Sequence, residues 1–327
     1  MNPLLKIEGL CTSFFTEDGI VKAVDGISLQ VNEGETVCIV GESGCGKSVT
    51  AMSLMGLVEE PAGRVTGGKI LFEETDLARL DKRTLAAIRG NTIGMIFQEP
   101  MSSLNPVLTI GRQIMEPLIV HLKMNRKAAR RRAVELIDQV GISRAEQIAE
   151  AYPHELSGGM LQRIMMAIAI CCGPKLLIAD EPTTALDVTI QAQILDMLRR
   201  IKEESHMAIL LITHDLGIVA EMADYVVVMY SGKIVEEGEV EELFRQPHHP
   251  YTRGLLKSKP VINQIQDELY SIPGQVPNPL ELKPSCYFHD RCPHCMNICK
   301  LKEPAMRESG SRHKVACWLY EEGEKNG

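Results

Sequence analysis

The sequence predicts an α/β fold with a largely parallel sheet, and two observations predict it. Over roughly the first 240 residues, short apolar runs alternate with longer helical patterns, and most of these runs are nearly uninterrupted by polar residues. Such runs are typical of strands that are buried on both faces of a sheet. Strands that alternate with helices in this way indicate a layered α/β domain.

Five apolar runs are expected to form the sheet, with four longer segments as helices between them. The strands are expected at Thr36–Val40, Thr92–Phe97, Leu176–Ala179, Ile209–Thr213 and Tyr225–Tyr230. The helices are expected at Lys47–Leu57, Arg126–Val140, Met160–Cys171 and Ile190–Glu203. Near the N-terminus, Leu5–Leu10 and Ala23–Val31 flank a polar turn that contains glycine, which predicts an antiparallel pair beside the main sheet. Residues 101–172 are mostly helical in pattern and are expected to form a helical subdomain.

The composition is that of an ordinary globular protein, with 45% hydrophobic and 24% charged residues among 327. The net charge of −8 gives no support to a global attraction to nucleic acid. We find no apolar run long enough to span a membrane and no secretory signal, so we expect the chain to stay in the cytoplasm. A local basic cluster is expected to be a solvated helix face, with a face near a membrane or a partner as the alternative: Arg126, Lys127, Arg130, Arg131 and Arg132.

A glycine-rich segment follows the expected strand Thr36–Val40 and precedes the helix expected from Lys47. It fits the pattern G-x-x-x-x-G-K-[ST] through Gly41, Glu42, Ser43, Gly44, Cys45, Gly46, Lys47 and Ser48. Glycines let backbone N–H groups wrap a phosphate chain, and the helix N-terminus adds its positive end. We expect Lys47 to reach the β- and γ-phosphates and Ser48 to ligate Mg²⁺. A chance glycine-rich turn is the alternative.

Two acidic residues follow the strand expected at Leu176–Ala179. Asp180 ends this apolar run, and Glu181 comes directly after it. A carboxylate at the end of a buried strand suits a role at Mg²⁺, and the next carboxylate can polarise a water for attack on the γ-phosphate. A buried strand that ends in an acidic turn is common by itself, but downstream of a phosphate-binding loop it predicts nucleoside triphosphate hydrolysis.

The segment Leu-Ser-Gly-Gly-Met at 156–160 resembles the signature sequence of ABC ATPases, continued here to Arg163. Ser157 and the N–H groups of Gly158 and Gly159 would bind a γ-phosphate that is held by the phosphate loop of another subunit. The resemblance therefore implies a dimer in which each chain supplies half of two ATP sites. A serine helix cap followed by a glycine turn is the structural alternative.

Further residues resemble elements of this family, in the family's order. Phe14 stands where these ATPases carry an aromatic ring that stacks on adenine; Phe15 is its rival, and a core position in the strand is the structural alternative. Gln98 resembles the Q-loop glutamine, which responds to the γ-phosphate and Mg²⁺ and signals to the permease. His214 resembles the switch histidine near the γ-phosphate. Ala185 to Asp187 resembles the D-loop, which crosses the dimer interface, and Asp187 as a simple helix N-cap is the alternative.

The resemblance narrows to the peptide and nickel importers among ABC transporters, and it covers nearly the whole chain. It rests on FQEPMSSLNP at 97–106, ADEPTTALDVTIQAQIL at 179–195, THDLG at 213–217 and QPHHPYTRGLL at 246–256. It implies an ABC ATPase domain over residues 1–258, with antiparallel β and helical subdomains, and a C-terminal extension over 259–327. The prolines from Pro247 to Pro284 predict an irregular connection before the cysteines.

The resemblance also implies the partners. In that branch, the ATP-hydrolysing subunit pairs with a paralogous ATPase under two permease subunits at the cytoplasmic face of the membrane, and an external solute-binding protein acts indirectly. A pair of identical chains is the alternative to the heterodimer. The implied cargo is a dipeptide or oligopeptide, with nickel or another small solute as the alternative.

Five cysteines crowd into residues 286–327 and are, in order, Cys286, Cys292, Cys295, Cys299 and Cys317. In a reducing cytosol, a metal site explains such a cluster better than disulfides do. Some members of the resembled family hold an iron–sulfur cluster through cysteines at the four outer positions, and Cys295 departs from that pattern as a substitute ligand. A [4Fe–4S] cluster is the preferred interpretation. Zinc, with His289, His294 or His313 as further candidate ligands, and no metal are the alternatives.

Two other functions would fit an ABC cassette. Soluble ABC ATPases of DNA repair or translation usually carry two cassettes or a long coiled-coil insertion, and we find neither in this sequence. A regulatory subunit with an inactive site is disfavoured by the intact Lys47, Asp180, Glu181 and His214. We therefore expect an ATP-hydrolysing subunit that uses ATP and Mg²⁺ to drive a separate permease.

Overall fold

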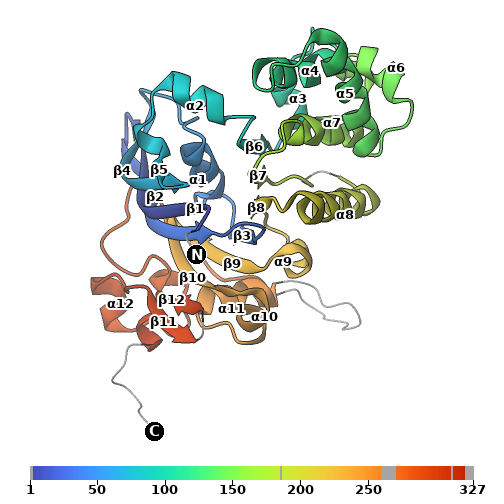
Figure 1. The fold of residues 1–327 in the computed structure, drawn as a ribbon. Helices are drawn as coiled ribbons and strands as arrows, with labels where there is room; N and C mark the ends of the chain where they lie inside the picture. The colour runs from blue at the N-terminus through green and yellow to red at the C-terminus, as the bar shows by residue number, and fades with distance from the viewer. Residues whose placement is uncertain (1–2, 185, 259–269, 311, 321–327) are drawn as a thin grey trace.

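Five parallel strands form the centre of the fold, in the order β9-β3-β8-β7-β6 (Figure 1). The computed structural model describes residues 3–184, 186–258, 270–310 and 312–320. The five strands are β3 (Thr36–Val40), β6 (Ile93–Ile96), β7 (Leu176–Asp180), β8 (Ala208–Ile212) and β9 (Tyr225–Tyr230). All five strands predicted from the apolar runs are confirmed, and their ends differ from the predicted ones by at most one residue.

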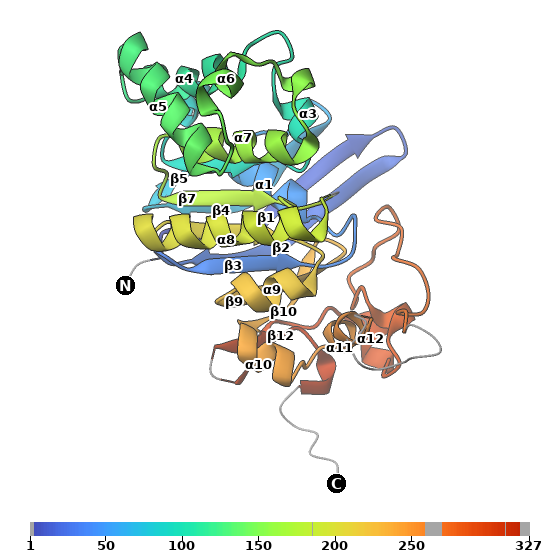
Figure 2. The same cartoon turned by 90° about the vertical axis from the view of Figure 1, so that its right-hand side faces the viewer.

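Both faces of this sheet are covered, which explains why its strands are apolar throughout (Figure 2). Along β7, Leu177 and Ala179 pack into a core on the side of α8 and the helical subdomain. Leu176 and Ile178 pack into a second core with α1 and the N-terminal strands. Successive side chains of a strand point to opposite faces, so one apolar run serves two cores.

The N-terminal strands form a second, antiparallel sheet in the order β2-β1-β4-β5. Its strands are β1 (Leu5–Thr16), β2 (Gly19–Val31), β4 (Gly63–Phe72) and β5 (Thr75–Asp76). The predicted antiparallel pair is therefore confirmed, but β1 runs on to Thr16, beyond the expected end at Leu10. The extra part was missed because two buried polar residues, Thr12 and Ser13, interrupt the pattern of apolar residues there.

Residues 101–172 are mostly helical, as the sequence predicts, and these helices project from the β6 end of the main sheet (Figure 1). It contains α3 (Pro100–Ser103), α4 (Ile110–Val120), α5 (Arg126–Gln139), α6 (Ala145–Glu150), the short 3₁₀ turn η2 (Pro153–Glu155) and α7 (Gly158–Ile170). The predicted helix at Met160 begins two residues earlier, at Gly158, because Ser157 caps it. The basic residues of α5 are exposed for the most part, in line with a solvated face.

The other helices cover the main sheet or join its strands. They are α1 (Lys47–Leu54), η1 (Leu77–Arg79), α2 (Lys82–Ile88), α8 (Val188–Ser205), α9 (Leu216–Met222), α10 (Val240–Arg245) and α11 (Pro250–Lys257). The prediction of an irregular connection from Pro247 is wrong at α11. Proline is favoured at the first position of a helix, and the His249 side chain caps this one by accepting a hydrogen bond from Tyr251 N–H at 3.1 Å.

The C-terminal segment, by which we mean residues 270–310 and 312–320, adds to the main sheet. It contains η3 (His289–Arg291), α12 (Asn297–Leu301), β11 (Arg307–Gly310), β12 (His313–Val315) and η4 (Trp318–Tyr320). β12 pairs with β10 (Lys233–Glu239), which itself pairs with β9, so the described sheet runs on as β11-β12-β10-β9. The domain boundary predicted after residue 258 adjoins residues 259–269, which lie outside the described residues, and it stays a prediction.

None of the helices in the described part of the chain is both long enough and apolar enough to span a membrane.

Candidate nucleotide-binding site

The loop at 41–46 connects β3 to α1, and its glycines are required by close backbone contacts. Gly46 has a φ of 102°, and a Cβ there would lie 2.3 Å from the carbonyl oxygen of Ala23. A Cβ on Gly41 would lie 2.2 Å from the carbonyl oxygen of Met229. No side chain fits at either position, so the loop can follow its tight path only with glycine.

The ammonium group of Lys47 lies inside this loop, and the residue is 5% exposed. Its Nζ donates to the carbonyl oxygens of Gly41, at 2.8 Å, and of Glu42, at 3.0 Å. The lysine therefore bridges back to the start of the loop that it follows. Phosphate oxygens that entered the loop would compete with these carbonyls for the ammonium protons.

Ser48 and Asp180 meet as the sequence predicts. The Ser48 hydroxyl donates to Asp180 Oδ1 at 3.0 Å, which joins the first turn of α1 to the end of β7. Burial raises the pKa of Asp180, the Ser48 hydrogen bond opposes that rise, and the nearby charge of Glu181 adds to it. A hydroxyl beside a carboxylate is a set of hard oxygen donors of the kind that Mg²⁺ takes, so these two residues fit the predicted metal.

The ends of three neighbouring strands bring Gln98, Glu181 and His214 together. Gln98 Nε2 donates to Glu181 Oε2 at 3.3 Å, and His214 Nδ1 lies 3.3 Å from Glu181 Oε1. These residues follow β6, β7 and β8, whose carboxyl ends lie at one edge of the sheet. The arrangement holds one carboxylate between an amide and an imidazole. Glu181 also has a left-handed φ of 47°, which is unfavourable for a residue with a side chain and is common at functional sites.

Thr184 is a member of this cluster that sequence reasoning missed. Its hydroxyl donates to Glu181 Oε2 at 2.8 Å, and its backbone N–H donates to the Glu181 carbonyl at 3.2 Å. A hydroxyl three residues after an acid is the signal that could have found it, because a tight turn returns that side chain to the carboxylate.

The signature residues begin α7 and are open to solvent. Ser157 is exposed, and its hydroxyl oxygen accepts from Met160 N–H at 3.4 Å. A Cβ on Gly158 would have no atom of the described residues within 4 Å, whereas one on Gly159 would lie 3.2 Å from Ile190. The chain itself therefore explains the glycine at 159 better than the one at 158.

Phe14 and Phe15 point to opposite faces of β1. Thr12 lies on the α1 side, where its hydroxyl is 2.8 Å from that of Ser53, and Phe14 is two residues further along the same strand. The Phe14 ring packs on Gly63 of β4, whereas Arg64 lies over the Phe15 ring at 4.6 Å. The strand alternation therefore favours Phe14 over Phe15 as the aromatic residue on the side of the phosphate loop.

Asp187 acts as a helix cap in this chain. Its side chain accepts from Ile190 N–H at 2.9 Å at the start of α8, which is the structural alternative raised from the sequence. Ala185, in the same predicted D-loop, lies outside the described residues.

Comparison with known proteins decides the family. Residues 24–184 match the ABC transporter family, and residues 235–299 match the C-terminal region of oligopeptide/dipeptide transporters. The oligopeptide transport ATP-binding protein AppD of Bacillus subtilis (strain 168) is 54% identical over 98% of each chain. The chain belongs to the ABC transporter ATPase family. The dipeptide transport ATP-binding protein DppD of the same organism is 48% identical over 98% of this chain and 96% of its own.

Solved structures of the bacterial ABC transporter cassette MJ0796 share the fold of this ABC ATPase. Its dimeric post-hydrolysis structure with bound ADP and Pi has a TM-score of 0.66 and 28% identity, and it covers 72% of this chain and 98% of its own. A second dimeric structure has a TM-score of 0.65 and 29% identity over the same shares. The protein is thus an ATP hydrolase of the ABC transport type, and more than a quarter of its chain lies outside the part that these cassette structures cover.

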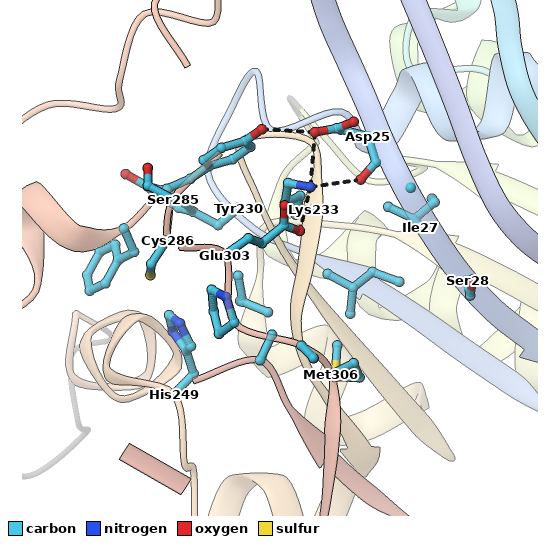
Figure 3. A pocket seen from close by; sticks show the side chains of 18 residues that line it. Asp25, Ile27, Ser28, Tyr230, Lys233, His249, Ser285, Cys286, Glu303 and Met306 are labelled. Carbon is cyan, nitrogen blue, oxygen red and sulfur yellow. Dashed lines mark hydrogen bonds and ion pairs between the residues drawn. The ribbon is translucent and has the colours of Figure 1, made fainter. Parts of the chain in front are cut away.

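The C-terminal segment contacts the ABC ATPase core around a cavity of about 220 Å³ (Figure 3). Lys233 of β10 lies between two carboxylates there, with Nζ 3.0 Å from Asp25 of β2 and 2.6 Å from Glu303 of the segment. The Tyr287 hydroxyl donates to Asp25 at 2.9 Å. These contacts fasten the segment to the strands behind the phosphate loop.

A buried acid and two histidines fasten the same segment to β10. Within the described residues, one group of three side chains of the kinds that can ligate a metal has its ligand atoms within 4.8 Å of one another. It consists of Glu236, His248 and His313. Glu236 accepts from His313 Nε2 at 2.8 Å and from the backbone N–H groups of His248 and His249 at 2.6 and 2.9 Å. The rings of His248 and His313 stack, with their centroids 4.4 Å apart. The acid already accepts hydrogen bonds from three donors, so the group is a buried hydrogen-bonded cluster rather than an open set of ligands.

Proposed function

We propose that this ABC ATPase powers the import of dipeptides or oligopeptides through a membrane permease. The observation that carries the proposal is its relationship to AppD and DppD over nearly the full length of each chain, together with the match of residues 235–299 to the C-terminal region of oligopeptide/dipeptide transporters. The motor and the C-terminal region are both shared with proteins whose names state peptide transport.

The proposed catalytic roles follow from the geometry of the site. Lys47 binds the β- and γ-phosphates, and Ser48, Asp180 and Gln98 hold Mg²⁺, which neutralises charge on the phosphates when it is bound. Glu181 orients a water and takes its proton as the water oxygen attacks the γ-phosphorus, so that ADP leaves. Its hydrogen bonds to Gln98 and Thr184 and its contact with His214 keep the carboxylate aimed. Backbone N–H groups of the loop surround the phosphates, and Phe14 stacks on the adenine.

The working unit in this proposal is a dimer. The exposed Ser157 and Gly158, with the half-buried Gly159, bind the γ-phosphate held by the other subunit, and Asp187 lies at the interface. Two features support this assignment: Gly158 has open space around it in its own chain, and the solved relatives that share the fold are described as dimeric. The partner is a paralogous ATPase, and a second copy of this chain is the alternative.

The proposed permease contact is a groove of about 830 Å³ in the helical subdomain. It is lined by apolar side chains, which include Met115, Ile119 and Val120, and by charged ones of both signs: Arg112, Arg126 and Arg130 with Glu116 and Glu150, of which Arg130 and Glu150 pair at 2.8 Å. Val120 is 51% exposed and Ile119 38%, which is unusual for such side chains unless a partner covers them. The apolar part of this groove suits a short, apolar permease helix, and such a contact would place the ATPase peripherally at the cytoplasmic face of the inner membrane.

The cysteines of the C-terminal segment are proposed to hold a [4Fe–4S] cluster. Burial, together with the nearby thiols of Cys299, Cys317 and Cys292, raises the pKa of Cys286 to about 12. The family resemblance implies the four outer cysteines as the ligand set, and Cys295, whose thiol raises the pKa of Cys292, is the substitute ligand. Four thiolates around one zinc ion would lie about 3.8 Å apart. Within the described residues, no three cysteine sulfurs lie within 4.8 Å of one another, so their positions do not match a site for a single zinc ion and fit either a larger group or no metal.

Reconstitution tests the proposed transport function. The ATPase should copurify with a permease and its solute-binding protein, and vesicles that contain them should take up a labelled di- or oligopeptide only with ATP. Replacing this chain with the Glu181→Gln variant should abolish the uptake. ATP-dependent uptake of Ni²⁺ with none of peptide would contradict peptide import. A Val120→Glu variant that copurifies as well as the wild type would contradict the docking groove.

A further inference from the structure

The second residue of the phosphate loop is held by the C-terminal segment. Arg291 of η3 pairs with Glu42 through two hydrogen bonds, from Nη1 to Oε2 at 2.7 Å and from Nη2 to Oε1 at 3.1 Å. The Arg291 side chain is 6% exposed and that of Glu42 is 27% exposed. Two parallel bonds between a guanidinium and a carboxylate fix direction as well as distance. A residue 249 positions away in the sequence thus orients a residue of the loop.

The guanidinium is itself held firmly. Its Nε donates to the Pro273 carbonyl at 3.0 Å, and Nη2 donates to the Ile272 carbonyl at 3.3 Å. It also lies 5.8 Å from the Tyr230 ring centre and 5.9 Å from that of Phe288. Because carbonyls, rings and a carboxylate surround it, Arg291 can act as a fixed point rather than as a flexible surface charge.

The backbone of Glu42 is held by a second residue that follows the core strands. Glu42 N–H donates to the hydroxyl of Tyr251 at 2.8 Å, and Tyr251 of α11 is fully buried. The Tyr251 ring packs against those of Tyr230 and Phe288, at centroid distances of 4.8 and 5.5 Å. Side chain and backbone of one loop residue are therefore fastened to the same aromatic cluster.

This anchor connects directly to the residue that is expected to bind phosphate. The carbonyl oxygen of Glu42 accepts from Lys47 Nζ, so a chain of contacts runs from Arg291 through Glu42 to Lys47. By contrast, Gln98, Glu181 and His214 follow β6, β7 and β8, whereas the phosphate loop follows β3. A change at Arg291 should therefore disturb the binding of the phosphates more than the attack of water.

We propose that Arg291 is a positioning residue for the phosphate loop: by fixing Glu42 it keeps the loop in the shape that accepts ATP, and the C-terminal segment thereby sets the affinity for nucleotide. A loop that is already ordered binds its ligand without the cost of ordering it. The inference rests on the proposed role of residues 41–48 in binding phosphate, and it does not depend on whether the cysteines hold a metal.

The test measures nucleotide binding on the full chain. Arg291→Met keeps the apolar stem and removes the guanidinium, and we expect it to weaken MgADP binding, followed by titration calorimetry, by roughly fivefold or more. The KM for ATP should rise by a similar factor, while kcat should change by less than about twofold. Arg291→Lys, which can donate to Glu42 without the parallel pair of bonds, should recover part of the affinity.

Three controls make the result specific. Glu303→Gln weakens another contact of the C-terminal segment, the ion pair with Lys233. It should leave the affinity for MgADP and the KM for ATP unchanged. Glu42→Gln changes the same contact from the loop side, so it provides the test if Arg291→Met does not fold. In the double variant, Glu42→Gln should cause little further loss of MgADP affinity beyond that of Arg291→Met. Lys47→Ala should abolish MgADP binding; if it does not, the role of the loop fails rather than that of Arg291. Unchanged MgADP affinity in Glu42→Gln and in any folded Arg291→Met, or an equal loss in Glu303→Gln, would overturn the proposal.

Discussion

The Ser48 hydroxyl donates to Asp180 Oδ1 across 3.0 Å, and this bond joins the phosphate loop to the end of β7. The two residues are 132 positions apart in the sequence. Because Asp180 is buried at the end of β7, its carboxylate has few other partners, and the serine determines where it can meet a metal ion. The bond holds the two residues that are proposed to bind Mg²⁺ next to each other, and Glu181, the proposed base, directly follows Asp180 in the sequence.

Removing this hydroxyl should change the dependence on Mg²⁺. We expect Ser48→Ala to raise the Mg²⁺ concentration that gives half-maximal ATP hydrolysis by roughly tenfold, since one oxygen donor is lost and Asp180 loses a hydrogen bond. The measurement is ATPase activity against free Mg²⁺ at saturating ATP. Ser53→Ala, a serine of the same helix whose hydroxyl contacts Thr12, is the matched control. An unchanged Mg²⁺ requirement in Ser48→Ala would remove Ser48 from the metal site.

Glu181→Gln should separate binding from hydrolysis. The amide keeps the size of the side chain but cannot take the proton of the attacking water, so we expect turnover to fall by about a hundredfold or more. ATP binding should persist and trap a closed dimer, which size-exclusion chromatography with MgATP would detect. Thr184→Ala removes one hydrogen bond to the same carboxylate, and its loss of turnover should be smaller. Normal hydrolysis by Glu181→Gln would assign the base to another residue.

The nucleotide site could be predicted from the sequence because each of its parts is local. Lys47 and Ser48 follow one buried strand, and Asp180 and Glu181 follow another, so short motifs at strand ends carry the chemistry. The carboxyl ends of neighbouring parallel strands share an edge, and this brings Gln98 and His214 to the same place.

The contacts of the C-terminal segment could not be predicted in this way. Arg291 and Glu42 belong to no common motif, and a buried arginine in a cysteine-rich stretch looks like any charged residue until its partner is known. The pairing of β12 with β10 joins three residues to a distant strand, which is too short a pattern to find from periodicity. Only the folded chain brings Glu236 and His313 together.

The Glu236–His313 pair predicts a pH-dependent stability. Burial alone would lower the pKa of His313, but the hydrogen bond and charge of Glu236 outweigh it and raise that pKa above the ordinary 6.5. The stabilisation from His313 is therefore complete below about pH 6.5 and is lost as the pH rises through its folded-state pKa. Burial alone would raise the pKa of Glu236, but its hydrogen bonds lower it below 4.5, so its contribution is lost only at more acidic pH.

Unfolding by urea between pH 5 and 9 measures this effect. The midpoint of the wild type should fall above about pH 6.5 more steeply than that of His313→Gln, which cannot titrate. His154→Gln, at an exposed histidine, should follow the wild type. Parallel curves for the wild type and His313→Gln would mean that the buried ring does not carry the charge in the folded protein.

The cysteine ligands can be distinguished by single substitutions. If the four outer cysteines hold the cluster, Cys292→Ser should lose iron and the visible absorption of the protein after anaerobic purification, whereas Cys295→Ser should keep both. Cys295→Ser is the matched control because Cys295 lies between Cys292 and Cys299 in the sequence but outside the proposed set of four ligands. Zinc in place of iron would contradict the cluster, and a colourless wild type without either metal would contradict both metals.

Gly158 offers a test of the dimer that does not disturb the fold of one chain. A Cβ there meets no described atom within 4 Å, so Gly158→Val should leave the thermal midpoint of the isolated protein within a few degrees of the wild type. In the closed dimer the new side chain would lie where the other subunit's γ-phosphate binds, and we expect ATPase activity to fall by about a hundredfold. The control is Gly173→Ala, a glycine that also has free space around it but lies at the far end of α7. Because Gly173 has a φ of 67°, which is unfavourable for alanine, Gly173→Ala is expected to lose some stability. Its ATPase activity should remain. Full ATPase activity of a stable Gly158→Val protein would mean that the signature does not complete a neighbour's site.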